Sequence, residues 1–295
     1  MNRRFEMVSL ADVAVLDATS IVLLVATIVV FTIPIFILFP PVPVDRTDAL
    51  QQTHSKLGVP SGESNLRTQT RADLHQPKPD QPGKIQSLHI YPIKSCKGIE
   101  LKEVKVTTKG FDLDRRFCFA QLKSSGAADS KQWEVITLRQ LALMANIAVD
   151  VWLPDKEKTS RQLGHVEGGF VVVRFPWKDA GVWGFVQAVA TKLSYGLSAV
   201  PRKEFWLPLE FPDVEEVKLR GYHYCDVKLF RKSIRVLNMS SEVPPELGRY
   251  LGAKDQVGLF RMDPTLQREV FDCAPMKEDI GYQPVVDFQD QVCSY

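Results

Sequence analysis

Two short segments concentrate residues of this chain that could bind an anion. The first, YPIKSCKG at residues 91–98, carries Lys94 and Ser95, and the second, GFDLDRRF at residues 110–117, carries Arg115. Ammonium and hydroxyl groups donate hydrogen bonds, and an arginine fork matches a phosphate or the polar edge of a ring. A structural role is the alternative, in which Lys94 is a solvated loop residue and Asp114 forms an ion pair with Arg115 or Arg116 that pins a strand end. Residue types alone favour that structural role.

The rest of the sequence offers few catalytic patterns. It has no Gly-x-Ser-x-Gly elbow, no phosphate-cradling glycine loop and no histidine-rich metal motif. The histidines His89, His165 and His223 are scattered, which is typical of strand or surface positions rather than of metal ligands.

The cysteines indicate the redox environment. They are odd in number, widely spaced and free of any Cys-x-x-Cys pair: Cys96, Cys118, Cys225, Cys273 and Cys293. This pattern argues against a disulfide framework and against a zinc site, so we expect a reducing compartment.

Short segments of β type must position the two motifs. Each is bounded by Gly or Pro signals and is rich in β-branched or aromatic residues. They span residues 85–91, 101–107, 116–122, 134–137, 147–152 and 170–175. Helical periodicity appears over residues 180–197 and more weakly over 244–251. We predict an α+β, mainly β fold whose antiparallel strands form a sheet or barrel.

A charge-free apolar run lies near the N-terminus. Residues 21–39 read IVLLVATIVVFTIPIFILF, interrupted only by two threonines and Pro34. Because about 20 apolar residues cross the ~30 Å hydrocarbon core of a bilayer, we predict a transmembrane anchor over residues 21–43 behind a flank at residues 1–20. A cleaved signal peptide and a buried core helix are the alternatives. Signal-peptide apolar regions are shorter, and the prolines that follow this run replace the small-residue cleavage pattern.

A polar stretch follows the apolar run. Residues 44–83 are rich in Pro, Gln, Ser, Thr and Asp and show no hydrophobic period. This composition predicts a disordered tether, with an irregular part of the domain as the alternative. The folded domain is then expected to begin at Lys84.

Composition excludes one class of partner. The 295 residues are 45% hydrophobic and 24% charged, which suits a globular protein with a sizeable core. The formal net charge is only +2, and Lys and Arg are spread among Asp and Glu. No basic stripe is left to neutralise phosphates, so nucleic acid is not expected as a partner.

The two motifs resemble the N-terminal β-barrel domain of MOSC proteins. This family includes the mitochondrial amidoxime-reducing component and the C-terminal part of molybdenum cofactor sulfurase. The similarity continues through ITLRQLALMANI at residues 136–147 and, more loosely, through ELGRYLG at 246–252 and VVDFQDQ at 285–291. It implies a barrel-like domain over residues 84–291, with an insertion at about 179–208 and a divergent tail at 292–295.

The resemblance implies binding of the molybdenum cofactor, molybdopterin, whose pterin carries a phosphate. In the family, the positions that match Lys94, Ser95 and Arg115 contact this cofactor. Thr137 and Arg139 match a family strand near the cofactor pocket and are secondary candidates. The thiolate that binds molybdenum comes from the later MOSC domain, so the resemblance assigns no catalytic residue and no metal ligand here, and the Cys96 beside the motif is not taken for one.

The resemblance also implies an activity and partners. It points to a membrane-bound reductase of N-hydroxylated compounds that receives electrons from a cytochrome b5 and its flavin reductase. Because the sequence stops where the MOSC domain would begin, we expect it to be truncated and inactive as written. A non-catalytic, membrane-tethered β-barrel module that binds a partner or an anionic ligand is the alternative, and a sulfurase-like protein is a further one. The anchored relatives imply the mitochondrial outer membrane with the domain facing the cytosol, and the endoplasmic reticulum is the alternative.

Overall fold

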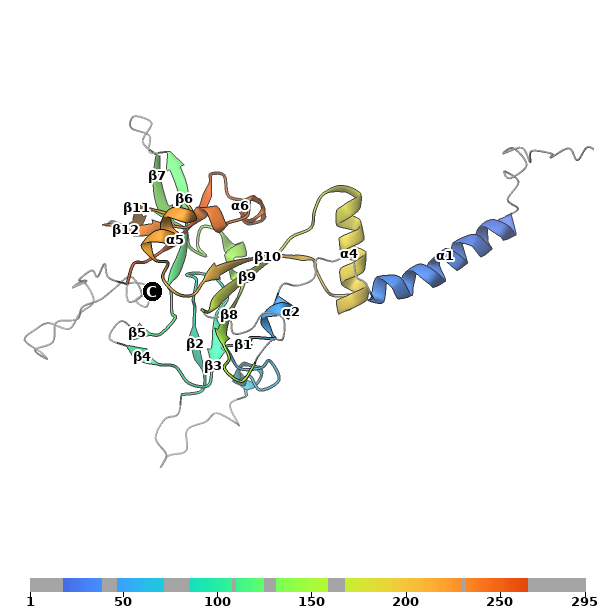
Figure 1. Ribbon diagram of the computed structural model, residues 1–295, viewed down its shortest axis with the longest axis horizontal. Helices are drawn as coiled ribbons and strands as arrows, with labels where there is room; N and C mark the ends of the chain where they lie inside the picture. Colours follow the sequence, from blue (N-terminus) through green and yellow to red (C-terminus); the bar gives the residue numbers. More distant parts are fainter. Residues whose placement is uncertain are drawn as a thin grey trace, which may run out of the picture. The chain divides into compact units, whose positions relative to one another are not determined.

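The structure is a computed structural model that describes residues 18–38, 47–71, 85–107, 110–124, 131–158, 168–229 and 232–264 (Figure 1). Its helices are α1 (Ala18–Leu38), α2 (Thr47–Leu50), α4 (Gly181–Tyr195), α5 (Val214–Leu219) and α6 (Pro245–Leu251), with 3-10 helices η1 (Asn65–Thr68), η2 (Ala142–Asn146) and η3 (Ser240–Glu242). Its strands are β1 (His54–Lys56), β2 (Leu88–Ile90), β3 (Ile99–Leu101), β4 (Val106–Thr107), β5 (Gly110–Phe111), β6 (Phe117–Ser124), β7 (Lys131–Val135), β8 (Ala148–Pro154), β9 (Phe170–Pro176), β10 (Arg202–Pro208), β11 (His223–Leu229), β12 (Lys232–Asn238) and β13 (Val257–Arg261).

The described chain falls into two compact units. One contains α1 and α4, and the other contains the remaining helices and all the strands named above. The predicted mainly β fold is confirmed, since the second unit is built from a closed barrel and a separate four-stranded sheet.

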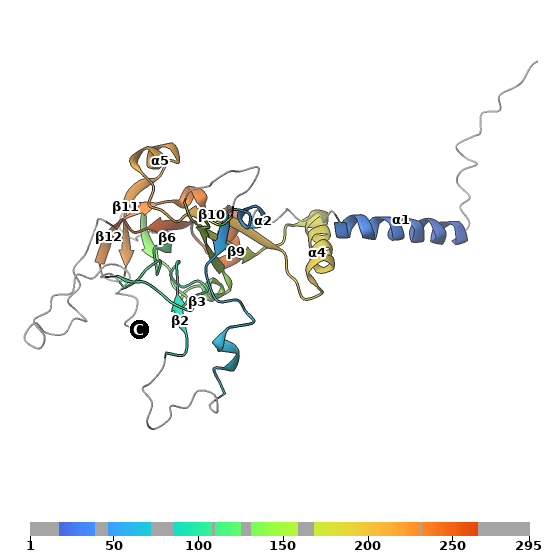
Figure 2. The same cartoon turned by 60° about the horizontal axis from the view of Figure 1, so that its bottom comes forward.

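The barrel has the strand order β11-β12-β13-β6-β7. Figure 2 labels its strands β11, β12 and β6. Four of its pairings are antiparallel, and a parallel pairing of β7 with β11 closes it. Side chains alternate across each strand. Along β6, Cys118 and Ala120 therefore face a small cluster with residues of the other barrel strands, while Phe117 and Phe119 join the main core.

The second sheet is antiparallel, with the order β1-β8-β9-β10. Its central strand β9 is apolar on both faces, because Val171, Val173 and Phe175 point into the main core while Val172 packs against Trp152 and Leu50. Covering both faces of a sheet explains why this strand reads as a continuous apolar run rather than as an alternating one.

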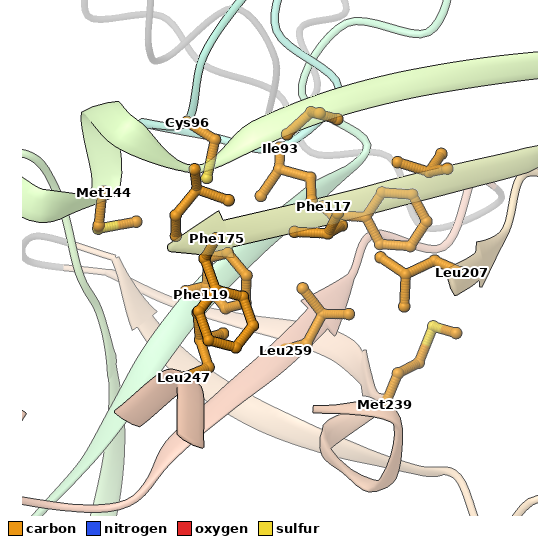
Figure 3. Packing of buried hydrophobic residues seen from close by; sticks show 14 of the residues in the cluster. Ile93, Cys96, Phe117, Phe119, Met144, Phe175, Leu207, Met239, Leu247 and Leu259 are labelled. Carbon is orange, nitrogen blue, oxygen red and sulfur yellow. The ribbon is translucent and has the colours of Figure 1, made fainter. Parts of the chain in front are cut away.

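The main core lies between the barrel and the four-stranded sheet. Figure 3 shows Phe117, Phe119 and Leu259 from the barrel packed against Phe175 and Leu207 from the sheet. Both parts therefore contribute to one hydrophobic core, and neither buries its apolar face alone.

The predicted segments mostly correspond to observed elements. Strands β2, β6, β7, β8 and β9 fall within or overlap the expected β segments, and α4 and α6 fall within the expected helical ones. The strand expected over residues 101–107 is wrong as one unit, because β3 ends at Leu101 and β4 begins only at Val106.

The predicted disordered tether over residues 44–83 is wrong for residues 47–71. Strand β1 pairs with β8, and the His54 imidazole is fully buried between the Thr53 hydroxyl (2.8 Å) and the Gly168 carbonyl (2.9 Å). A three-residue strand is too short to show a hydrophobic period, so composition alone predicted a coil. The sheet therefore begins before Lys84. The other tether residues, 44–46 and 72–83, lie outside the described residues.

The insertion expected at about 179–208 includes a strand of the sheet. All seven residues of β10 pair with β9. The part of the expected insertion that does not belong to the second unit is therefore within residues 178–201. Residues 18–20 of the expected flank at 1–20 belong to α1, and its residues 1–17 lie outside the described residues. So do His165 and everything after residue 264, including the motif at 285–291, the tail at 292–295, Cys273 and Cys293.

Helix α1 covers residues 21–38 of the predicted anchor, and the remaining residues 39–43 of that prediction lie outside the described part of the chain. Residues Ala18–Ile35 have a mean hydropathy of 2.5 and none of that window is buried, so α1 is long and apolar enough to cross a membrane. Two of its threonine hydroxyls bond within the helix, where Thr27 donates to the Leu23 carbonyl (2.8 Å) and Thr32 to that of Ile28. Such internal bonding suits a helix surrounded by lipid, which offers no partners to polar groups.

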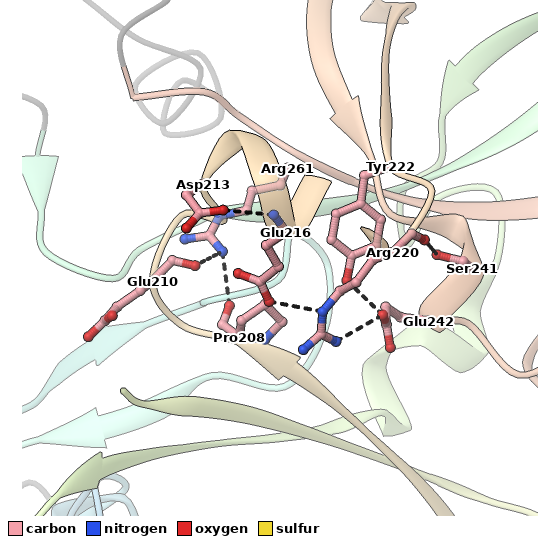
Figure 4. Close-up of polar contacts among 9 residues, drawn as sticks. All are labelled: Pro208, Glu210, Asp213, Glu216, Arg220, Tyr222, Ser241, Glu242 and Arg261. Carbon is pink, nitrogen blue, oxygen red and sulfur yellow. Dashed lines mark hydrogen bonds and ion pairs between the residues drawn. The ribbon is translucent and has the colours of Figure 1, made fainter. Parts of the chain in front are cut away.

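A buried arginine ties the barrel to the four-stranded sheet. Arg261, on β13, is only 2% exposed and donates to three consecutive carbonyls at the end of β10: those of Pro208 (2.9 Å), Leu209 (2.6 Å) and Glu210 (2.7 Å). Figure 4 shows the bonds to Pro208 and Glu210. Its guanidinium also lies 4.9 Å from the centroid of the Phe117 ring. Burial and the neighbouring Arg116 lower the pKa of Arg261 to about 10, so this side chain is charged at neutral pH.

Replacing Arg261 should be strongly destabilising. We expect Arg261→Met to lower the free energy of unfolding by about 3 kcal/mol, because one buried and two partly buried carbonyls lose a charged donor. Arg261→Lys should be intermediate, since an ammonium lacks the planar fork. Urea unfolding of the chain in detergent micelles, followed by circular dichroism, measures both. The control is Arg235→Met, which removes an exposed arginine of β12 and should cost less than about 1 kcal/mol. Equal losses in Arg235→Met and Arg261→Met would contradict this role.

Candidate functional site

Two segments that are separated in the sequence lie side by side at the start of β6. Residues 91–94 pair with residues 114–117, and we call this pairing the site clasp. Four hydrogen bonds hold it: Tyr91 N to Asp114 Oδ1 (2.6 Å), Arg115 N to Tyr91 O (2.7 Å), Phe117 N to Pro92 O (3.0 Å) and Lys94 N to Phe117 O (2.9 Å). The clasp brings Lys94 and Arg115, the two predicted cations, to one place.

Each segment of the clasp adjoins a tight turn. In the first turn, Cys96 N donates to the Ile93 carbonyl (3.2 Å) and Ser95 at the third position has φ 66°. In the second, Asp114 N donates to the Phe111 carbonyl (3.2 Å) and Leu113 has φ 65°. Glycine or asparagine usually occupies such positions, since a left-handed backbone costs other residues about 1–2 kcal/mol.

Among the described residues other than glycine, the left-handed conformation is confined to this region. Among the described residues, the non-glycine positions with positive φ are Ser95, Leu113 and Arg115, the last with φ 48°. Two of the three are predicted cofactor-binding residues. Backbone strain of this kind clusters at binding sites, where the surrounding fold keeps it in place.

Lys94 is the buried cation of the site. The residue is 4% exposed, and burial lowers the pKa of its ammonium below the ordinary lysine value, with the nearby Arg115 guanidinium acting in the same direction. Two cations held this close repel each other, and a bound anion would relieve the repulsion. The arrangement therefore suits a phosphate better than a neutral ligand.

Arg115 is held by its neighbours on the clasp. Its Nη1 bonds Asp114 Oδ2 (3.0 Å), and its guanidinium lies 5.9 Å from the centroid of the Tyr91 ring. Burial raises the pKa of Asp114, opposed by the hydrogen bond from Tyr91 and by Arg115. The ion pair expected as the structural alternative is therefore present, and it also fixes the direction of the arginine fork.

Gly98 makes room for the tyrosine of the clasp. A Cβ atom at this position would lie 2.7 Å from the Tyr91 ring, closer than atoms can pack. The glycine that ends the YPIKSCKG motif is therefore required by the position of the Tyr91 ring.

The two cysteines near Lys94 are buried and protonated. Cys96 is fully buried in the main core, which raises the pKa of its thiol far above the usual range. Burial raises the pKa of Cys118 to about 12, although the Lys94 ammonium acts in the opposite direction. Both are neutral thiols at neutral pH, whereas a soft metal is bound by a thiolate.

Thr137 and Arg139 lie in the turn that follows β7 and are not part of the clasp. The predicted strand around Thr137 is wrong, because β7 ends at Val135 and Thr137 begins a turn in which its amide and hydroxyl both bond the Gln140 side chain (2.7 and 3.2 Å). Thr137 is half-buried and Arg139 is exposed. Ile136 N still donates to the Phe119 carbonyl (3.0 Å), so this turn follows directly on the pairing of β7 with β6.

Sequence reasoning missed Cys118 and Arg261 as neighbours of the site. Cys118 lies close enough to affect the pKa of Lys94, and Arg261 contacts the ring of Phe117, the residue that closes the clasp. Both are single residues inside apolar strands and belong to no motif. Only the pairing of β6 with β13 reveals that Arg261 lies opposite Phe117.

One comparison with known proteins identifies a domain. Residues 82–164 match the family model described as the MOSC N-terminal beta barrel domain. This match includes the whole clasp, both tight turns and the Thr137 turn. No curated protein matches the chain.

Replacing Lys94 should stabilise the fold at neutral pH. Burial holds the pKa of Lys94 below its unfolded value of 10.5, so the folded state binds this proton less tightly than the unfolded state does. We expect Lys94→Met to raise the Tm most at pH values below the folded pKa and progressively less as the pH approaches 10.5. Thermal melts of the chain in detergent at several pH values measure this. Lys97→Met, which removes an exposed lysine of the same motif, is the control and should change the Tm little. A pH-independent effect of Lys94→Met would contradict the burial argument.

The strain at Ser95 can be measured by comparing glycine with alanine. Because φ is 66° here, we expect Ser95→Gly to be more stable than Ser95→Ala by about 1 kcal/mol. At Ser233, exposed on strand β12, the order should reverse, since glycine is worse than alanine within regular elements by roughly 0.5–1 kcal/mol. Urea unfolding of the four variants tests both statements, and the same order at the two sites would show that Ser95 is not strained.

Proposed function

We propose that the barrel-containing unit binds the molybdenum cofactor, with Lys94, Ser95 and Arg115 holding the phosphate and the polar edge of the pterin. The observation that carries this proposal is the site clasp, which fixes a buried ammonium beside a guanidinium and keeps Ser95 and Arg115 in strained backbone conformations. The MOSC N-terminal beta barrel match over the same residues supports the choice of this cofactor, since the MOSC family is associated with it.

The donors around the clasp fit such a ligand. An ammonium, a hydroxyl and a guanidinium all donate hydrogen bonds, and phosphate oxygens accept them. The neighbouring carboxylate of Asp114 already bonds Arg115 and the Tyr91 amide, so much of its negative charge is engaged within the fold. The clasp therefore offers preorganised cations, and little reorganisation is needed when an anion binds.

We assign this unit the pterin and its phosphate rather than the metal. Cys96 and Cys118 are buried neutral thiols, and a thiolate from another part of a MOSC protein would bind molybdenum. When bound, the cofactor would supply oxygen-atom transfer, and this unit would orient it. Reduction of N-hydroxylated compounds, with electrons from a cytochrome b5 and its flavin reductase, remains part of the proposal.

The proposal places the protein at a membrane through α1. Length, hydropathy and the internally bonded threonines support a span. The non-catalytic binding module uses the same anchor and the same cations, and it differs only in the ligand. The cofactor content of the purified protein therefore separates the two functions.

Pterin content tests the proposal without an activity assay. The full chain is produced in a host that makes molybdenum cofactor and is purified in detergent, and the oxidised pterin released from it is quantified by fluorescence. We expect a substantial content in the wild-type chain and an about tenfold or larger loss in Lys94→Met and Arg115→Gln, because hydrogen bonds to charged groups contribute roughly 1.5–3 kcal/mol.

Matched controls remove the same charge from the neighbouring positions. Lys97→Met and Arg116→Gln should retain the wild-type pterin content, and circular dichroism should show that all four variants are folded. A folded wild-type chain without pterin would overturn the proposal in favour of the non-catalytic module. Equal content in all four variants would show that Lys94 and Arg115 are not the binding residues.

A further inference from the structure

Helix α4 carries its apolar stripe on the outside. Val182, Phe185, Val186, Val189 and Leu193 follow one another at helical spacing and form a single face. Val182 is 81% exposed, Phe185 65% and Leu193 50%. In a soluble helix this face would be turned into the core.

The opposite side of α4 is the buried one. It is formed by small or polar residues, of which Gly184 and Thr191 are buried and Gln187 is half-buried with its amide bonded to Asp179 (2.9 Å). The helix is thus inverted with respect to a soluble amphipathic helix. Such an inversion is expected where the surroundings of the helix are themselves apolar.

The residues that flank the stripe are those of a membrane interface. Trp183 and Tyr195 lie near the two ends of α4 and are 69% and 64% exposed. The helix contains no carboxylate, and its one charged residue is the exposed Lys192. Aromatic side chains and lysine stems are favoured where hydrocarbon meets headgroups.

Helix α4 is associated with the candidate transmembrane helix. Both belong to the same compact unit and contact each other, and one end of α1 lies beside α4 in both views (Figures 1 and 2). A bilayer that surrounds α1 would therefore continue to the exposed stripe of α4. This continuity selects lipid, rather than another protein, as the occupant of the stripe.

We infer that α4 is a second membrane contact, lying in the interface with its apolar stripe among the acyl chains. With 15 residues, α4 is about 22 Å long and too short to cross a ~30 Å hydrocarbon core, so it lies along the surface. The inference rests on the proposed anchoring by α1, and it adds that residues 178–201 contact lipid directly.

Depth-dependent quenching of Trp183 tests this contact. The full chain is reconstituted into phosphatidylcholine and phosphatidylserine vesicles that carry a spin label either near the headgroup or at the chain end. The emission of Trp183 is the difference between the wild-type chain and Trp183→Phe. We expect strong quenching by the headgroup-proximal label and weaker quenching by the chain-end label.

Two carboxylate variants provide the matched comparison. Phe185→Glu places a charge on the stripe, and Ser194→Glu places the same charge on α4 away from it. Phe185→Glu should at least halve the quenching, whereas Ser194→Glu should leave it near the wild-type level. Equal effects of the two substitutions would overturn the inference.

The outcomes separate α4 from the other proposals. A chain that floats with the vesicles while Trp183 is not quenched overturns the contact by α4 and leaves the anchor intact. Protection of Trp183 from aqueous iodide without lipid quenching means that protein covers the stripe, which also overturns it. A chain that does not float overturns both α4 and α1 as membrane contacts. The pterin content of the same samples reports on cofactor binding independently of all three results.

Discussion

The pairing of residues 91–94 with residues 114–117 is the constraint on which the candidate site depends. Its four hydrogen bonds fix where β6 begins and which side chains lie around that point. Phe117 takes part through both its amide and its carbonyl, and its ring is fully buried in the main core. The packing of the Phe117 ring therefore holds the clasp in place, so the strained turns on either side cannot relax without disturbing the core.

The same residue connects the clasp with the junction between barrel and sheet. Arg261 lies against the Phe117 ring and donates hydrogen bonds to three consecutive carbonyls at the end of β10. Without Arg261, one buried and two partly buried carbonyls would lose this charged donor, which is costly. A charged side chain in the core thus completes the backbone hydrogen bonding where the two parts meet, and it holds in place the strand from which the site extends.

The site and the α1–α4 unit have one property in common. Each places side chains in surroundings that are unusual for them in a soluble protein. Lys94 is a cation kept out of water, and α4 exposes an apolar stripe. The two proposals name what would offset these costs, an anion beside Lys94 and lipid around the stripe. These two features, rather than the regular core, are the ones on which the proposals are built.

The sequence determined the elements whose signal is local. Apolar runs, glycine and proline boundaries and the YPIKSCKG and GFDLDRRF motifs predicted α1, the strands β2, β6, β7, β8 and β9 and the cations Lys94 and Arg115, because each signal lies within a few residues. The strands β10 to β13 were not predicted. Nor did the sequence predict β1, a three-residue strand that exists because β8 offers an edge to pair with. It also could not reveal the partnership of Arg261 with Phe117, the burial of Lys94 or the inversion of α4. Burial and long-range pairing are properties of the assembled chain, so only the tertiary structure decided them.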